Sequence, residues 1–237
     1  MKKIFTICIG LTLHNISYAQ DLLCESSYPE FNQYITDSHK ISKYGDIKQL
    51  NKFYEDHAYS RLFKSKHPNH TYHGGDWMEN KEYQLTLQFQ QATTKSDKYQ
   101  HIKFNLQPPK ANFISTVGEV CVVPWTSEDK FFDKTYISQT DLIFVRNLNS
   151  NQWRNFVYLG IEKPEDFKEF FPDFPKSIKL SAATANGQYA TTNQVYEIST
   201  NMLKFLFKSE LSPAVVEEIN NTIKDAEERL KVNGFNE

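Results

Sequence analysis

The sequence predicts a single α+β domain behind a cleavable signal peptide, and three observations carry this prediction. After residue 20, apolar residues first recur at helical spacing, then alternate as in strands, and then return to helical spacing near the C-terminus. This order of elements is typical of α+β domains, in which helices pack on an antiparallel sheet. We therefore expect an N-terminal helical hairpin, an antiparallel sheet of about five strands, and C-terminal helices.

Residues 1–19 have the three parts of a secretory signal peptide. Lys2 and Lys3 form the basic start, residues 4–13 form the apolar middle, and Ala19 ends a small-residue cleavage pattern. The apolar run is shorter than the roughly 20 residues that a membrane-spanning helix needs. Residues 20–237 are therefore predicted to form one exported globular domain, periplasmic or secreted, with no membrane insertion in the mature form.

Charge and composition limit the expected partners. The chain has 27 basic and 29 acidic side chains, and removal of Lys2 and Lys3 with the signal peptide leaves a mildly acidic domain. No basic stripe remains that could follow a phosphate backbone or an anionic membrane surface. No linker rich in Pro, Ser or Gly separates two cores. We therefore expect one domain that binds neither nucleic acid nor a membrane.

Two cysteines remain after signal-peptide cleavage, Cys24 and Cys121. In an oxidising compartment an even pair with no third thiol predicts a disulfide bond. The alternative is a nucleophilic or metal-ligating cysteine. A disulfide here would fasten the N-terminus to a predicted strand and close a long loop, where the chain-entropy model gives roughly 2–4 kcal/mol.

Two helices are predicted before residue 60. Ser27 can cap the first helix, Pro29 suits its first turn, and Gly45 ends it. The second helix is expected to begin after Asp46, which can form a capping box with Gln49. The short connection between them predicts a helical hairpin. Apolar residues at helical spacing support both helices: Phe31, Tyr34, Ile35 and Ile41 in the first, and Ile47, Leu50, Tyr54 and Ala58 in the second.

The apolar period then changes from 3.6 to 2. Between Tyr83 and Phe89, apolar residues alternate with Gln and Thr, which is typical of a strand with one solvated face. The turn-rich segment 147–151 is expected to join the last two strands as a hairpin. Because the connections are short, we expect an antiparallel sheet. Further strands are predicted at 102–106, 120–123, 136–145 and 153–159.

The C-terminal third is predicted to be helical. A short helix is expected in the Phe-rich segment 167–174, and a buried one over 196–207. The last helix has Ser212 as its N-cap and Pro213 in its first turn, and Gly234 stops it.

The helical hairpin followed by a curved antiparallel sheet resembles the NTF2-like α+β cone. The sequence GDIKQL at 45–50, running on to Phe53 and Tyr54, resembles the second helix of that family, and NQWRNF at 151–156 resembles its final strands. The resemblance covers about residues 27–160, and the C-terminal helices extend beyond the family's usual length. It implies a pocket between sheet and helices, which members of such folds use for catalysis or for plain binding.

Four polar side chains on the predicted strands could line such a pocket. The pocket candidates are His101, Asp141, Arg154 and Tyr158. The alternative interpretation is a solvated strand face for His101 and a surface ion pair for Arg154. Trp77 and Trp125 stand beside turn residues, where they either anchor the edge of the core or, if exposed, contribute to an interaction surface.

A second candidate site is a histidine-rich segment. His67, His70 and His73 recur every three residues, and neutral imidazole is the commonest protein ligand of zinc and copper. Pro68 and the glycines at 74–75 indicate a loop that does not fix the imidazole nitrogens. The spacing matches no closed structural zinc pattern, so a polar connection without a cofactor is predicted.

No recognised catalytic spacing occurs in the chain. The G-x-S-x-G elbow, the S-x-x-K motif and the HExxH motif are all missing. The sequence therefore favours an exported binding protein with a protein partner, for example an inhibitor or immunity-type protein that neutralises an envelope-acting enzyme. The alternatives are an NTF2-like small-ligand pocket protein or enzyme, and a metal-binding protein that uses the loop His67–His73.

Overall fold

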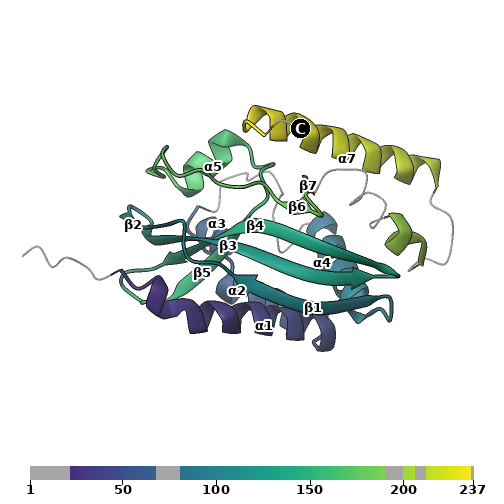
Figure 1. The fold of residues 1–237 in the computed structure, drawn as a ribbon, viewed down its shortest axis with the longest axis horizontal. Coiled ribbons are helices and arrows are strands. Elements are labelled where there is room, and N and C mark those ends of the chain that lie inside the picture. Colours follow the sequence, from purple (N-terminus) through teal and green to yellow (C-terminus); the bar gives the residue numbers. More distant parts are fainter. Residues whose placement is uncertain (1–21, 68–80, 190–199, 206–211, 236–237) are drawn as a thin grey trace, which may run out of the picture.

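The computed structural model describes residues 22–67, 81–189, 200–205 and 212–235. Its architecture is α+β, as predicted, with helices before and after an antiparallel sheet. In Figure 1, α1 (Tyr28–Tyr44) lies below the sheet, whereas α5 (Pro164–Phe170) and α7 (Pro213–Val232) lie above it. No helix among these residues is both long and apolar enough to cross a membrane.

Four helices precede the sheet, and the predicted hairpin is formed by the first two. After a 3-10 turn at Glu25–Ser27 they are α1 (Tyr28–Tyr44), α2 (Ile47–His57), α3 (Tyr59–Lys66) and α4 (Lys81–Lys95). The capping box of α2 is confirmed: the Gln49 N–H donates to Asp46 Oδ1, and the Asp46 N–H donates to Gln49 Oε1, each at 2.8 Å. Gly45 is required between α1 and α2, because a Cβ atom there would lie 2.7 Å from the carbonyl oxygen of Ile41.

The start of α1 differs from the prediction. Ser27 occupies the N-cap position, but its side chain makes no capping hydrogen bond. The Ser27 hydroxyl instead accepts a hydrogen bond from the indole Nε1 of Trp153 at 2.9 Å. A long-range contact has therefore replaced the local cap, and it ties the N-terminal segment to the last long strand.

One antiparallel sheet forms the centre of the domain. A long hairpin of β3 and β4 runs in register from Glu119 opposite Arg146 to Phe131 opposite Lys134. β1 and β2 pair with β3, while β5 and β6 pair with β4, and β7 pairs with β6. The strands are β1 (Tyr99–Leu106), β2 (Ala111–Ser115), β3 (Gly118–Phe131), β4 (Lys134–Arg146), β5 (Trp153–Tyr158), β6 (Thr184–Ala185) and β7 (Gln188–Tyr189).

The predicted strand between Tyr83 and Phe89 is wrong, because this segment belongs to α4. Besides the buried Leu87, the inner face of α4 contains polar groups that a hydrophobic pattern does not register. Gln90 Nε2 donates to the Tyr54 hydroxyl at 2.9 Å, and the Thr94 hydroxyl donates to the Ser42 carbonyl at 2.9 Å. These bonds hold α4 against α1 and α2. The other four predicted strands are confirmed as parts of β1, β3, β4 and β5, whereas β2, β6 and β7 were not predicted.

Both faces of the central hairpin are buried. On one face, Cys121, Leu142 and Phe144 pack with α1. On the other face, Val122 and Ile143 pack with α3 and with α5 (Pro164–Phe170), the short helix expected in the Phe-rich segment. The predicted disulfide between Cys24 and Cys121 is present in the first of these cores, and it links residues 97 positions apart.

The C-terminal helices follow the prediction as far as they are described. Residues 200–205 are helical and Met202 is fully buried, while the rest of the predicted helix 196–207 lies outside the described residues. α7 (Pro213–Val232) is capped by Ser212, whose hydroxyl accepts from the Val215 N–H. Asn233 ends α7 and donates to the carbonyls of Gly160 and Glu162, which fastens the helix to the loop after β5.

Candidate functional site

Helix α1 brings side chains to the sheet at two places along one helical face. Near its start, Phe31 stacks on Phe144 with ring centroids 3.8 Å apart and meets Trp153 edge-on at 5.0 Å. Residues eight positions apart differ by about 80° around an α-helix, so they belong to the same broad face. His39 therefore also faces the sheet, where its ring centroid lies 3.9 Å from that of His101 on β1.

His39 and His101 belong to a hydrogen-bonded cluster that also contains Tyr99 and Asp129. Asp129 Oδ1 accepts from the Tyr99 hydroxyl and lies next to His101 Nδ1, each at 2.8 Å. The same hydroxyl lies 3.1 Å from His39 Nε2. Asp129 Oδ2 accepts from the hydroxyl of Ser127 at 2.8 Å. We call His39, Tyr99, His101, Ser127 and Asp129 the histidine cluster.

The pairing of β1 with β3 creates the centre of this cluster. His101 stands directly opposite Asp129 in the antiparallel register, and directly opposite side chains project from the same face of a sheet. Burial alone would raise the pKa of Asp129, but hydrogen bonds from His101, Ser127 and Tyr99 lower it below its usual value. Burial, together with neighbouring His101, lowers the pKa of His39. The cluster therefore combines an ionised carboxylate with a neutral imidazole at neutral pH.

A groove runs between α1 and α2 on the outside of the helical hairpin. It has a volume of about 730 Å³, and apolar atoms of Ile41 and Phe53 contribute to its wall. Tyr44, at the end of α1, lines the groove and is 74% exposed. Its charged lining residues are Lys40, Lys48, Lys52, Asp37 and Asp56.

A small pocket continues from this groove towards the sheet. Its volume is about 170 Å³, and it shares Asp37, Phe53 and His57 with the groove. Aromatic residues from α1, α2, β4 and β5 line it. Asn155 is buried in this wall: its Oδ1 accepts from the Tyr34 hydroxyl at 3.4 Å, while its Nδ2 has no hydrogen-bond partner among the described residues.

His57, where the groove meets the pocket, should make folding stability sensitive to acid. Burial lowers its pKa below the usual 6.5, Arg154 acts in the same direction, and Asp56 opposes this. Below pH 6.5 the unfolded chain therefore binds a proton that the folded chain resists, so stability falls as the pH falls. We expect His57→Gln to lose less stability between pH 7.5 and pH 5.5 than the wild type, as measured by urea unfolding. An equal loss in both proteins would contradict this assignment.

The four predicted pocket residues do not share one pocket. His101 lies in the histidine cluster. Arg154 lines the small pocket and donates to the Glu55 carbonyl at 2.6 Å, so it is not in a surface ion pair within the part that the structure describes. Asp141 and Tyr158 stand opposite each other in the register of β4 and β5. They lie on the other face of the sheet from His101.

On that face, the contacts of Asp141 and Tyr158 hold neighbouring elements together. Asp141 is fully buried, and its Oδ2 accepts from Lys110 Nζ at 2.7 Å and from the Ser181 N–H at 2.6 Å. Tyr158 packs against Phe167 of α5 with ring centroids 5.5 Å apart. Burial raises the pKa of Tyr158, which keeps its hydroxyl protonated. This pair joins the sheet to the loop before β6 and to α5.

The remaining predicted site residues are separated from these features. Trp125 is half-buried and packs against the Cys24–Cys121 core, so it is an anchor at the core edge and not an exposed aromatic. His67 is exposed just after α3, where it stacks on Phe63 with ring centroids 4.4 Å apart. His70, His73 and Trp77 lie outside the described residues.

Sequence reasoning missed four members of the histidine cluster, namely His39, Tyr99, Ser127 and Asp129. His39 could have been found from helical spacing, because it follows Phe31 by eight residues on the face predicted to be buried. Tyr99, Ser127 and Asp129 could not be found in this way. Their proximity to His101 depends on the β1–β3 register, which the sequence pattern does not specify.

Comparisons with known proteins identify no relative. No family model matches the chain. No curated protein and no solved structure matches it either.

Proposed function

We propose that the chain is an exported binding protein that uses the α1–α2 groove to hold a segment of a partner protein. The observation that carries this proposal is Tyr44, which is 74% exposed at the end of a groove with apolar wall residues. Protein interfaces concentrate their binding energy in a few such aromatic anchors, surrounded by a polar rim. A concrete form is an inhibitor or immunity-type protein that neutralises an envelope-acting enzyme.

Two features support export. The predicted signal peptide precedes the described residues, and the disulfide between Cys24 and Cys121 is of the kind that persists in oxidising compartments. Both are compatible with a periplasmic or secreted protein.

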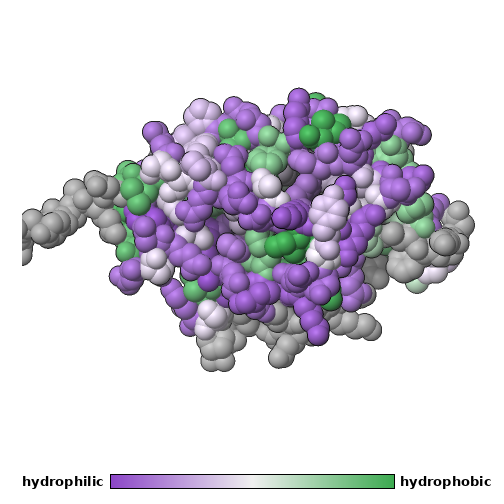
Figure 2. All heavy atoms as spheres, turned by 90° about the horizontal axis from the view of Figure 1, so that it is seen from below, coloured by the Kyte–Doolittle hydropathy of each residue, from purple (hydrophilic) through white to green (hydrophobic). Residues whose placement is uncertain are grey.

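The surface of the α1 side favours a local anchor over a broad apolar contact. Figure 2, which views the molecule from this side, shows a mostly hydrophilic face with small, separate hydrophobic areas. Along the groove, Lys52 is paired with Asp56 at 2.8 Å, while Lys40 and Lys48 are exposed. Lys43 adds a further cation, with its Nζ 5.5 Å from the centre of the Tyr44 ring. A partner segment with an apolar side chain flanked by carboxylates would complement this surface.

Tyr44→Ala should weaken partner binding by about tenfold or more, because it removes the proposed anchor. Lys40→Glu with Lys48→Glu should weaken binding further and remove most of its salt dependence. The experiment is capture from envelope extract on the immobilised wild-type chain, identification of the bound protein, and titration of that purified protein against each variant.

Two exposed positions away from the groove provide matched controls. Val232, which is 71% exposed on α7, is changed to Ala, and the exposed Lys176 is changed to Glu. Both variants should bind as tightly as the wild type. A partner that binds the Tyr44 and lysine variants with unchanged affinity would place the interface elsewhere and reject the groove.

A second candidate function is small-ligand binding in the pocket beside the groove. The unpartnered Nδ2 of buried Asn155 offers a donor to a ligand carbonyl or carboxylate between aromatic walls. This candidate agrees with the resemblance to the NTF2-like cone, which stays a prediction. The two functions differ in which residue they need, because protein capture depends on Tyr44 and ligand binding in the pocket depends on Asn155.

A further inference from the structure

We propose that His39, His101 and Asp129 form a binding site for a divalent transition metal of the zinc class. This site is separate from the groove and is not the histidine-rich segment His67–His73 that the sequence suggests. Imidazole and carboxylate are the ligands that zinc accepts alongside thiolate, and two imidazoles with one carboxylate also suit other first-row metals.

The geometry brings one ligand atom from each of three elements together. α1 supplies His39, β1 supplies His101 and β3 supplies Asp129, and their candidate ligand atoms all lie within 4.8 Å of one another. Zinc binds nitrogen and oxygen at about 2.0–2.2 Å, so ligand atoms around a tetrahedral ion are roughly 3.3–3.5 Å apart. Modest side-chain rotations are enough to close the site, because His101 Nδ1 and Asp129 Oδ1 already lie 2.8 Å apart.

Hydrogen bonds from neighbouring side chains fix the orientation of the Asp129 carboxylate. The nearly buried Ser127 donates to Oδ2, which leaves Oδ1 directed at the imidazoles. The Tyr99 hydroxyl donates to Oδ1 and lies 3.1 Å from His39 Nε2, so it contacts two of the three proposed ligands. Hydrogen-bonded outer groups of this kind fix the orientation of metal ligands and raise affinity.

The three ligand positions are held by regular secondary structure. His101 and Asp129 are directly paired across β1 and β3, next to an irregularity in the register between His101 and Lys103. α1 is fixed near its start by the Phe31–Phe144 stack and near its end by the bond from Thr94 to the Ser42 carbonyl. Sites on such elements are more precise than sites on loops.

The experiment is zinc titration of the full exported chain, purified without an affinity tag and stripped with a chelator. Calorimetry should show one equivalent of zinc bound at micromolar concentration or below. Cobalt, used as a spectroscopic substitute, should give visible absorption bands typical of a low-coordinate site. Zinc should also raise the melting temperature, because it binds the folded chain preferentially.

Variants distinguish zinc binding by the histidine cluster from zinc binding by the loop His67–His73, and from a cluster that only stabilises the fold. His39→Gln and His101→Asn keep a side-chain amide that can donate a hydrogen bond, and each should weaken zinc binding by about 100-fold or more. Ser127→Ala should weaken it by about tenfold. Replacing His67, His70 and His73 together with Ala should leave the affinity unchanged.

Three results would overturn the proposal. The first is the lack of stoichiometric zinc binding. The second is an affinity for zinc in the His39→Gln and His101→Asn variants that equals that of the wild type. The third is loss of zinc binding only in the variant with the three loop histidines replaced. Circular dichroism and the metal-free melting temperature verify that each variant is folded. Because the groove is not altered, partner capture through Tyr44 should persist in the cluster variants, so failure of either proposal is distinguishable from failure of the other.

Discussion

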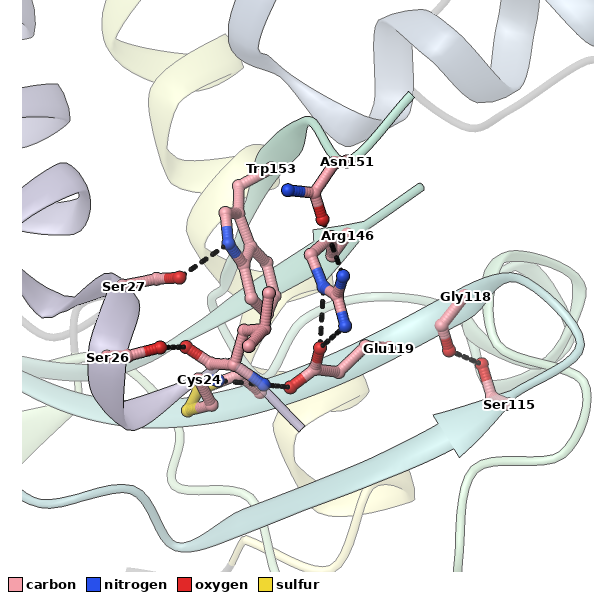
Figure 3. A network of polar contacts seen from close by, with 11 residues as sticks. Cys24, Ser26, Ser27, Ser115, Gly118, Glu119, Arg146, Asn151 and Trp153 are labelled. Atoms are coloured by element: carbon pink, nitrogen blue, oxygen red, sulfur yellow. Dashed lines mark hydrogen bonds and ion pairs between the residues drawn. A yellow bond between two sulfur atoms is a disulfide. The ribbon is translucent and has the colours of Figure 1, made fainter. Parts of the chain in front are cut away.

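Replacing Glu119 with alanine is expected to lower the free energy of unfolding by about 3–5 kcal/mol. Glu119 is fully buried opposite Arg146 in the β3–β4 hairpin. Its Oε2 accepts from Nε of Arg146 at 2.6 Å and lies 2.5 Å from Nη2 (Figure 3). Its Oε1 accepts from the N–H groups of Leu23 and Cys24, at 2.7 and 3.0 Å.

The expected cost is large because the alanine variant removes the carboxylate that lies against the charge of Arg146 and that accepts from two backbone N–H groups. Arg146 is only 4% exposed, so its guanidinium cannot regain hydration without a rearrangement. The hydrogen bond from Arg146 to Asn151 Oδ1 does not neutralise the charge. The two N–H groups before α1 also lose their acceptor, and each unsatisfied buried group costs about 1–3 kcal/mol.

Urea unfolding of four proteins measures this effect. They are the wild type, Glu119→Ala, Arg146→Met, and the double variant Glu119→Leu with Arg146→Met. The double variant should be more stable than Glu119→Ala, because it removes the buried charge together with its partner. It should not recover wild-type stability, since Leu23 and Cys24 still lack an acceptor.

An exposed ion pair in the same sheet is the matched control. Lys103 Nζ lies 3.1 Å from Glu128 across β1 and β3, and the Lys103 side chain is 72% exposed. Lys103→Ala should therefore cost less than about 1 kcal/mol. If Glu119→Ala costs no more than Lys103→Ala, the buried pair does not hold the N-terminal segment as described.

Local signals in the sequence predicted much of the fold. The capping box of Asp46 and Gln49 and the cap at Ser212 follow from hydrogen bonds within a few residues, so the pattern alone identifies them. Cys24 and Cys121 are the pair that the predicted signal-peptide cleavage would leave, which made the disulfide predictable without any geometry. Such features need no knowledge of the tertiary contacts.

The failures occurred where tertiary contacts decide the outcome. α4 was interpreted as a strand because apolar residues alternate with Gln and Thr between Tyr83 and Phe89. Its contacts with the other helices include the polar side chains of Gln90 and Thr94, which a hydrophobic pattern does not register. Ser27 was expected to cap α1, but its hydroxyl instead accepts a hydrogen bond from the indole of Trp153, which is 126 residues away in the sequence. The histidine cluster depends on strand register for the same reason, so only His101 was selected from the sequence.

Removal of the Cys24–Cys121 disulfide is expected to lower the free energy of unfolding by about 2–5 kcal/mol. The bond closes a loop of 97 residues, and a long loop loses much conformational entropy in the unfolded chain when it is cross-linked. The variant to measure has both cysteines replaced with alanine. Alanine is preferred to serine because both positions are fully buried, and a serine hydroxyl there would need a partner.

The native fold should survive this change, because other contacts hold the same segment. Glu119 still accepts from the Leu23 and residue-24 N–H groups, and Trp153 still donates to Ser27. The disulfide and Glu119 both fasten residues 23–24 to β3. When the cysteine replacements are combined with Glu119→Ala, the loss of unfolding free energy should therefore differ from the sum of the two separate losses.

Intact mass with and without reductant verifies the bond in the wild type, and urea unfolding gives the free energies. Freely alkylated thiols at both Cys24 and Cys121, or a cost below about 1 kcal/mol for the alanine pair, would show that the disulfide does not stabilise this domain.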